Sequence, residues 1–291
     1  ALKTWNVSGD GNNTAVGSEA GVGLTTGVSC VFVGAEAGKA AQDVDSLVLI
    51  GDNAGKTINH SNSDGTIAIG RDAATALISG DQSIYIGFEA GKENTTGGNN
   101  TIIGHKAMNE TGAVPASEHN TFIGVDSGGG DWVTAACDAN VGVGNYTLDG
   151  AMNGALYNVA IGYAAGSAVT EGDSNVFVGK YAGVAVTTGN LNVALGTNAL
   201  VSATSCSENI AIGYDAFGDA DAGEGGNVVI GNEAGNAINN AAADHNVIIG
   251  ISAGQGGTGA MAQCVAIGKG AMNSTSSNAQ TGTVAIGSDA L

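Results

Sequence analysis

The chain has 291 residues, of which 50 are glycine, one is proline and 4% are aromatic, so its apolar core must be narrow and built from small aliphatic side chains. Eight Lys and Arg against 27 Asp and Glu give a formal charge of −19, which argues against binding to nucleic acid or to anionic membranes. There is no run of 18 apolar residues, so no membrane insertion is predicted.

A repeat fills the sequence: sixteen times, a β-branched or aliphatic pair is followed by glycine and a small-residue turn, at spacings of 17 to 20 residues. These repeat glycines are Gly17, Gly34, Gly51, Gly70, Gly87, Gly104, Gly124, Gly144, Gly162, Gly179, Gly196, Gly213, Gly231, Gly250, Gly268 and Gly287. Such a period is typical of a solenoid, whose units bury their apolar faces by stacking. We expect an all-β parallel β-solenoid of 16 coils, one repeat domain over residues 1–291 and about 75 Å long at ~4.8 Å per rung.

The three residues before each repeat glycine are predicted to form a short strand, from 14–16 and 31–33 through to 284–286. The residue directly before the glycine is Ile, Val or Leu in all 16 units, and the residue three before it is Val or Ile in 13. Since these positions are two apart, they share one side of the strand. We expect them to line the inside of the coil. Segments such as 184–186 and 201–203 are predicted to form a second strand in each coil.

The turns carry their own pattern. Asn stands four residues before the glycine in ten units, which predicts side-chain hydrogen bonds between equivalent residues of successive coils. Ala stands three residues after it in 14 units, which indicates an inward corner with room for one methyl group. The next position is glycine in nine units, which predicts a positive φ there.

The position two before the repeat glycine is also apolar, although it lies on the opposite side of the strand. Stacked in register, it forms an apolar stripe too large for a soluble monomer to expose. We therefore predict that this stripe is buried against identical chains around a threefold axis. The side chains of this predicted trimer core are Phe32, Leu49, Tyr85, Ile102, Phe122, Phe177, Val229 and Ile248.

Several phrases resemble known repeat families. Residues 158–162 (NVAIG), 264–268 (CVAIG) and 283–287 (TVAIG) resemble the head repeats of trimeric autotransporter adhesins. Residues 99–107 (NNTIIGHKA) and 120–124 (NTFIG) look more like repeat regions of phage tail-fibre proteins. The resemblance covers essentially the whole chain. It implies a left-handed, trimeric β-roll used for surface attachment.

Four aromatic residues are candidates for receptor contact. Trp132 lies in a 20-residue unit whose extra residues should emerge as a loop, and a tryptophan there could stack on a sugar ring. Tyr163 and Tyr214 directly follow repeat glycines and should be exposed, and Tyr146 follows Gly144 by two residues. The predicted ligand is a glycan or protein of a host surface.

No catalytic, metal or cofactor site is predicted. The hexapeptide pattern of β-helix acyltransferases fails, because the residues six and twelve after Ile161 are Ser167 and Asp173. The four histidines are scattered and the four cysteines are too far apart to pair. Acidic residues two after the glycine are interpreted as a solvated edge rather than a glycosidase pair. The acidic loop 219–224 lacks the spacing of known β-roll calcium repeats.

The sequence therefore favours a non-enzymatic, rigid trimeric shaft that mediates host or surface attachment, in a virion tail fibre or at a cell surface. The last coil ends at Leu291 without a polar cap, which predicts a segment of a longer fibre or end-to-end stacking. The alternatives are a bacterial trimeric autotransporter adhesin head, a self-assembling extracellular filament and, least favoured, an ice-binding protein. Ice binding needs a regular threonine face, and the strands carry Thr in only three units of 16.

Overall fold

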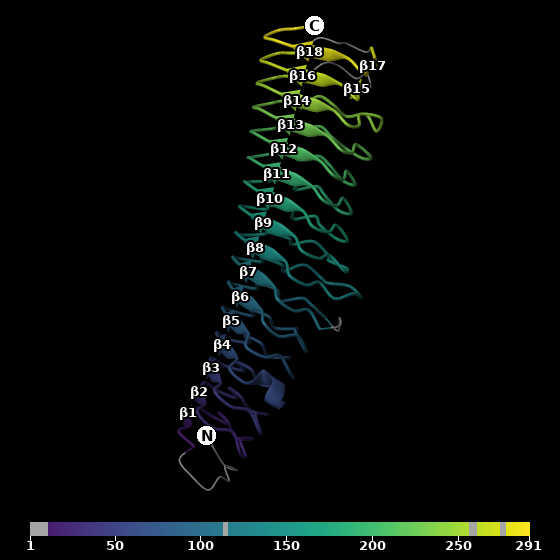
Figure 1. The fold of residues 1–291 in the computed structure, drawn as a ribbon. Coiled ribbons are helices and arrows are strands. Elements are labelled where there is room, and N and C mark those ends of the chain that lie inside the picture. The colour runs from purple at the N-terminus through teal and green to yellow at the C-terminus, as the bar shows by residue number, and fades with distance from the viewer. Residues whose placement is uncertain (1–10, 113–115, 256–260, 274–277) are drawn as a thin grey trace. The chain divides into compact units, whose positions relative to one another are not determined.

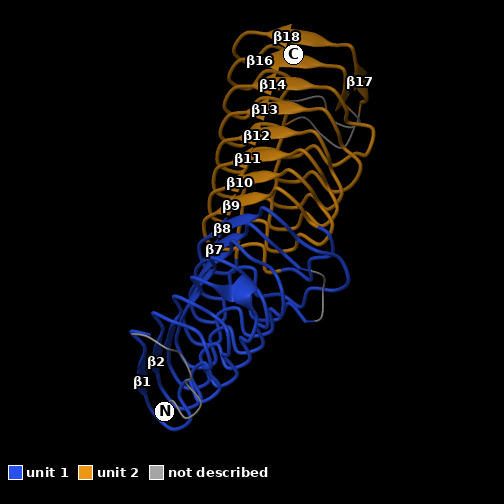
Figure 2. Cartoon of the chain, turned by 60° about the horizontal axis from the view of Figure 1, so that its bottom comes forward, with its two compact units in different colours: residues 1–146, 150–154 blue, residues 147–149, 155–291 orange. Residues whose placement is uncertain are grey.

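The computed structural model describes residues 11–112, 116–255, 261–273 and 278–291, which form a parallel β-solenoid. It comprises two compact units, residues 1–146 with 150–154 and residues 147–149 with 155–291 (Figure 2). The same coil repeats within each unit. No helix in the described ranges is long and apolar enough to cross a membrane.

Each unit contains one parallel sheet built from one strand per coil (Figure 1). In the first unit the strands are β1 (Thr14–Val16), β2 (Val31–Val33), β3 (Val48–Ile50), β4 (Ile67–Ile69), β5 (Ile84–Ile86), β6 (Thr101–Ile103), β7 (Thr121–Ile123) and β8 (Val141–Val143). A 3-10 turn, η1 (Ser61–Ser63), lies between β3 and β4.

In the second unit the strands of the main sheet are β9 (Val159–Ile161), β10 (Val176–Val178), β11 (Val193–Leu195), β12 (Ile210–Ile212), β13 (Val228–Ile230), β14 (Val247–Ile249), β16 (Val265–Ile267) and β18 (Val284–Ile286). A small second sheet pairs β15 (Met261–Ala262) with β17 (Gln280–Thr281). All described pairings are parallel and join equivalent positions, as in Val176 opposite Val193. The strands predicted before each repeat glycine are confirmed.

Each strand is short because the backbone leaves the extended region on both sides of it. The residue five before the repeat glycine is left-handed, as at Ser174 with φ 57°. The repeat glycine itself has a φ near 136°, as at Gly179. A Cβ on Gly179 would lie 2.4 Å from the carbonyl oxygen of Gly196 in the next coil. The repeat glycine is therefore required by both its φ and the close approach of the next backbone.

The second strand predicted in each coil is wrong for most coils. Residues 184–186 form turns instead, because the backbone takes left-handed conformations at Tyr181 and Gly183 just before them. Hydrogen bonds between coils continue there nonetheless, as from the Ala168 amide to the Val184 carbonyl. The predicted positive φ at the fourth position after the repeat glycine is confirmed, at Gly183 and even where the residue is Leu200.

The core of each coil lies on the side of the strand opposite to the one predicted. In every strand of the main sheets except β1, the middle residue is buried and the residues on either side of it are half-buried or exposed. The two aliphatic ladders exist, but they face outward. The inner wall contains the middle residues, the alanine corner and the residue that follows that alanine.

These inner positions compensate for one another in size. Where the strand supplies a large side chain, the facing turn supplies glycine: a Cβ on Gly183 would lie 2.3 Å from the Phe177 ring. Where the strand supplies alanine, the turn supplies bulk, and Ala211 and Phe217 of one coil are both fully buried. The relation holds in most coils but not in all, since Ile102 and Met108 of one coil are both large and Ala160 and Gly166 of another are both small.

A ladder of buried asparagines runs along the inside of the second unit, through Asn158, Asn175, Asn192, Asn209, Asn227 and Asn246. Each side-chain oxygen accepts from the backbone amide of the next asparagine, as from Asn192 N to Asn175 Oδ1 at 2.9 Å. Each side-chain nitrogen donates to a turn carbonyl of the next coil, as from Asn192 Nδ2 to the Cys206 carbonyl at 2.8 Å. The predicted asparagine stacking is confirmed.

Candidate interaction surface

The eight side chains predicted to form a trimer core lie inside their own coils. Phe32, Leu49, Tyr85, Ile102, Phe122, Phe177, Val229 and Ile248 are all fully buried within the single chain. Tyr85 satisfies its hydroxyl there with the amide of Asn94, at 2.8 Å. The expectation that these residues need neighbouring chains to cover them is wrong.

The missed signal was the inverse size relation between the strand and the turn. A fully apolar three-residue strand shows two faces but does not say which one turns inward. The pairing of Phe32 with Gly38, and of Ala211 with Phe217, shows that the middle residue and the turn share one space. That relation is visible in most coils of the sequence, but pairs such as Ile102 with Met108 depart from it, so it is only a partial signal of the inner face.

The outward face of each sheet is instead made of the two aliphatic ladders. Side chains on it that are more than a third exposed include Val16, Ile123, Ile161, Val176, Leu195, Ile210, Val284 and Ile286. The first unit interrupts its ladder with Thr14, Thr101 and Thr121, whereas the second unit has only Val, Ile and Leu at these positions. The second unit therefore exposes the more continuous apolar face.

Of the four predicted receptor-contact residues, three are on the surface. Tyr146, Tyr163 and Tyr214 are 37%, 46% and 52% exposed, so the expected exposure of Tyr163 and Tyr214 is confirmed. The Tyr163 ring meets the Tyr181 ring edge-on, with centroids 5.5 Å apart, and the Lys180 ammonium lies 4.8 Å from the Tyr181 centroid. Contact with a receptor stays a prediction for these tyrosines.

Trp132 does not lie in an exposed loop. Its side chain is 2% exposed and meets the edge of the Phe122 ring, with centroids 6.0 Å apart. The indole ring is therefore part of the buried interior. Stacking of Trp132 on a sugar ring is therefore ruled out in this conformation.

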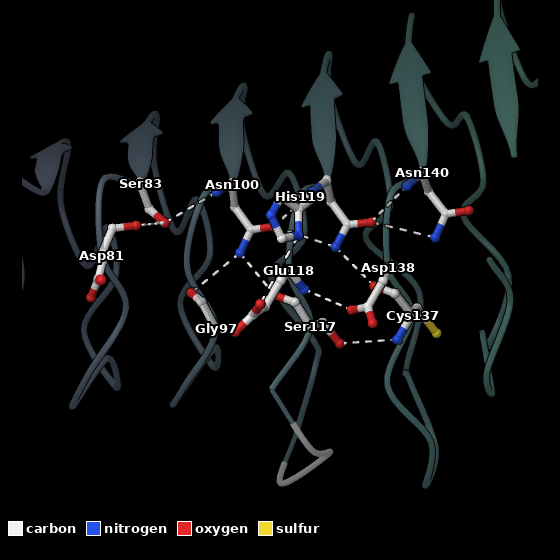
Figure 3. Close-up of polar contacts among 11 residues, drawn as sticks. Asp81, Ser83, Gly97, Asn100, Ser117, Glu118, His119, Cys137, Asp138 and Asn140 are labelled. Atoms are coloured by element: carbon white, nitrogen blue, oxygen red, sulfur yellow. Dashed lines mark hydrogen bonds and ion pairs between the residues drawn. The ribbon is translucent and has the colours of Figure 1, made fainter. Parts of the chain in front are cut away.

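A shallow polar groove of about 190 Å³ lies on the first unit. Its lining residues come from successive coils: Asn62, Ser79, Gly80, Asp81, Thr96, Gly97, Gly98, Asn99, Ala116 and Glu118. Residues 113–115, which belong to the longest predicted insertion, lie outside the described residues. The Asn100 side-chain amide donates to the Gly97 and Ser117 carbonyls (Figure 3).

The carboxylates at this edge bond to the backbone. Asp138 Oδ1 accepts from the Glu118 amide at 2.8 Å (Figure 3), and Asp64 Oδ1 accepts in the same way from the Asp45 amide. The same contact recurs in the second unit, where Asp173 accepts from the Leu156 amide at 2.7 Å. This acidic column satisfies backbone donors of the neighbouring coil, so it has a structural explanation.

Four of the acidic residues two after the repeat glycine, Glu19, Glu36, Asp72 and Glu89, form surface ion pairs. Lys39 contacts Glu19 at 2.6 Å and Glu36 at 3.3 Å, and Lys56 contacts Glu36 at 2.5 Å. These bonds, from Lys56 first and then Lys39, hold the pKa of the Glu36 carboxyl below its ordinary value. A general acid needs the opposite shift in pKa, so Glu36 does not have the properties of a glycosidase acid.

The four cysteines are free and buried. The Cys206 thiol donates to Glu224 Oε2 at 3.0 Å, in an inner corner where the Glu224 side chain is fully buried. Burial, and secondarily the Glu224 carboxylate, raises the pKa of the Cys206 thiol to about 12. A thiol with so high a pKa is a poor nucleophile at neutral pH. Among the described residues, no group of three His, Cys, Asp or Glu side chains could hold a metal ion.

Comparisons of the chain with protein-family models, with curated proteins and with solved structures gave no match. The function is therefore inferred from the fold and its exposed surface.

Proposed function

We propose that the chain is a structural segment of an extracellular attachment fibre, most simply a phage tail fibre. The observation that carries this proposal is the unbroken repetition of one coil within each unit. Within each unit, backbone hydrogen bonds join successive coils, the asparagine ladder adds to them in the second unit, and the strands of the described residues stay in the stack. Such a body supports a rigid spacer whose turns present side chains at regular intervals.

The attachment role rests on the exposed aromatic residues of the turns. Tyr163 and Tyr214 combine an apolar ring with a polar hydroxyl, the combination enriched at recognition surfaces. The ligand class proposed is a glycan or protein of a host surface. Self-association belongs to the same proposal, although the buried middle residues no longer require the threefold arrangement predicted from the sequence.

Attachment is tested with the labelled chain and whole cells of candidate hosts. The fibre role predicts saturable binding that the Tyr163→Ala/Tyr214→Ala double variant weakens, with a circular dichroism spectrum unchanged from that of the parent chain. The Trp132→Phe variant is the control, because its ring is buried and should not affect binding. Binding that is absent, or unaffected by loss of both tyrosines, counts against attachment through this surface.

The second candidate is the head of a trimeric autotransporter adhesin, favoured by the 264–268 and 283–287 phrases. The sequence flanking this segment distinguishes the two. Genes for virion components beside it support the tail fibre. A coiled-coil stalk and a membrane barrel in the same chain support the adhesin.

A further inference from the structure

We propose that the outward sheet face of the second unit is a self-association interface that binds a second copy of the chain around a twofold axis parallel to the stack of coils. The inference rests on the proposed structural role, since it names the partner with which that role is performed. It starts from the exposure of aliphatic side chains that the coil itself leaves uncovered.

The face is widest at β9. In that coil, three outward side chains at alternating positions are Tyr157, Val159 and Ile161. Tyr157 and Ile161 are 62% and 40% exposed. Leu191 and Leu195 repeat the pattern at β11. Aromatic and aliphatic side chains clustered at the centre of a surface are typical of the residues that dominate binding energy.

The borders of the face are polar for most of its length. Ser174, Glu208 and His245 lie on the border before the strands, and Lys180 and Lys269 lie on the border after them. An apolar centre with a polar rim is the ordinary anatomy of a protein interface. The middle residue of each strand is buried. The two ladders on either side of it are therefore the only continuous aliphatic columns on the described surface of these strands.

The size of the face matches that of a stable complex. Eight rungs at ~4.8 Å extend about 34 Å, and the residues between the two bends of a coil, such as 157–162, extend about 16 Å at ~3.3 Å each. The footprint is therefore about 550 Å² per partner, or about 1,100 Å² for the pair, above the ~1,000 Å² that a specific interface needs. A monomer seldom leaves an apolar surface of this kind in water.

The two aliphatic ladders of the outward face differ in side-chain size. This difference favours a twofold axis that runs parallel to the stack of coils. The residue three before the glycine is Val in seven of the eight strands, with Ile210 as the exception. The residue directly before the glycine is Ile in six, with Val178 and Leu195 as the exceptions. A twofold axis along the stack sets the smaller column of one copy against the larger column of the other, coil by coil, and such pairing packs well.

A threefold arrangement uses the face differently. In a cyclic trimer each chain meets its two neighbours through two different surface strips. The second unit has one continuous aliphatic face, and a twofold axis buries that face entirely against its own copy. The face thus fits an isologous dimer better than a trimer.

The test is the mass of the full chain in solution, measured by light scattering and sedimentation. The expected mass is twice the chain mass of 28.2 kDa. The Val193→Lys/Ile210→Lys variant, which places charges at the centre of the face, should weaken the dimer by about 100-fold or more. The Ser205→Lys/Ala222→Lys variant adds the same charges at exposed turn positions and should leave the dimer intact.

A milder variant guards against misfolding. Val193→Thr/Ile210→Thr uses the residue that the first unit already has at Thr101 and Thr121, so the coil should fold. It should weaken the dimer by about tenfold while its circular dichroism stays that of the parent chain. A monomer at high concentration, a trimer, or equal weakening by the face and turn lysines would overturn the proposal. Attachment to cells is not read out, so this proposal and the attachment role can fail separately.

Discussion

The asparagine ladder gives the sharpest test of how the coils are held together. We expect the Asn192→Ala variant to lose far more stability than the removal of one hydrogen bond would suggest. The side chain of Asn192 donates to the Cys206 carbonyl at 2.8 Å and to Asn175 Oδ1 at 3.0 Å. Its oxygen accepts from the Asn209 amide at 3.1 Å and from Asn209 Nδ2 at 3.3 Å.

The size of the stability loss depends on which hydrogen-bond partners of Asn192 have no other partner. Asn209 Nδ2 keeps the Glu224 carbonyl at 3.0 Å, and Asn175 Oδ1 keeps the Asn192 amide. The Cys206 carbonyl and the Asn209 amide lose the partner they have. A buried polar group left without a partner costs about 1–3 kcal/mol, so the variant should lose about 2–6 kcal/mol of unfolding free energy.

Urea unfolding followed by circular dichroism measures this loss, and hydrogen exchange at the Asn209 amide measures it locally. Asn192→Ser is the matched control. Ser83 stands at the equivalent position of another coil, and its Oγ accepts from the Asn100 amide at 3.1 Å. The serine variant should therefore recover part of the loss. A change below about 0.5 kcal/mol in the alanine variant would refute the role given to the ladder.

Two further predictions concern the repeat glycine and the buried thiol. Gly179→Ala should destabilise the chain more than Gly287→Ala in thermal unfolding. Both glycines have a φ near 130–136°, but only at Gly179 would the new Cβ meet the backbone of the next coil. Equal losses of stability in the two variants would mean that this close approach of the backbone is unimportant. The Cys206 thiol should not react with a thiol reagent at pH 8 until the chain unfolds. Because the folded pKa of this thiol, about 12, exceeds its ordinary value of 9.0, its contribution to stability is complete below pH 9 and is lost as the pH rises from 9 to 12. The parent chain should therefore lose more stability than Cys206→Ser over that range, and parallel curves would contradict the raised pKa.

The candidate surface was only partly predictable. The exposure of Tyr163 and Tyr214 follows from their place directly after a repeat glycine, where the chain turns toward solvent. Trp132 belongs to a long unit, and length alone does not say whether the extra residues bulge outward or enlarge the coil. In the structure, the Trp132 ring packs against Phe122 in the interior, where a large apolar ring gains the most free energy from burial.

The period of 17 to 20 residues, the strand before each glycine, the asparagine ladder and the alanine corner were all determined by the sequence, because each is a local constraint repeated in every unit. Only the tertiary structure decided which side of the strand is the core. A triplet such as Val176-Phe177-Val178 is apolar on both sides, so its alternation has no polar face to mark the solvent side. The left-handed residues on either side of the strand bend the chain toward Phe177, and that bend turns the valines outward.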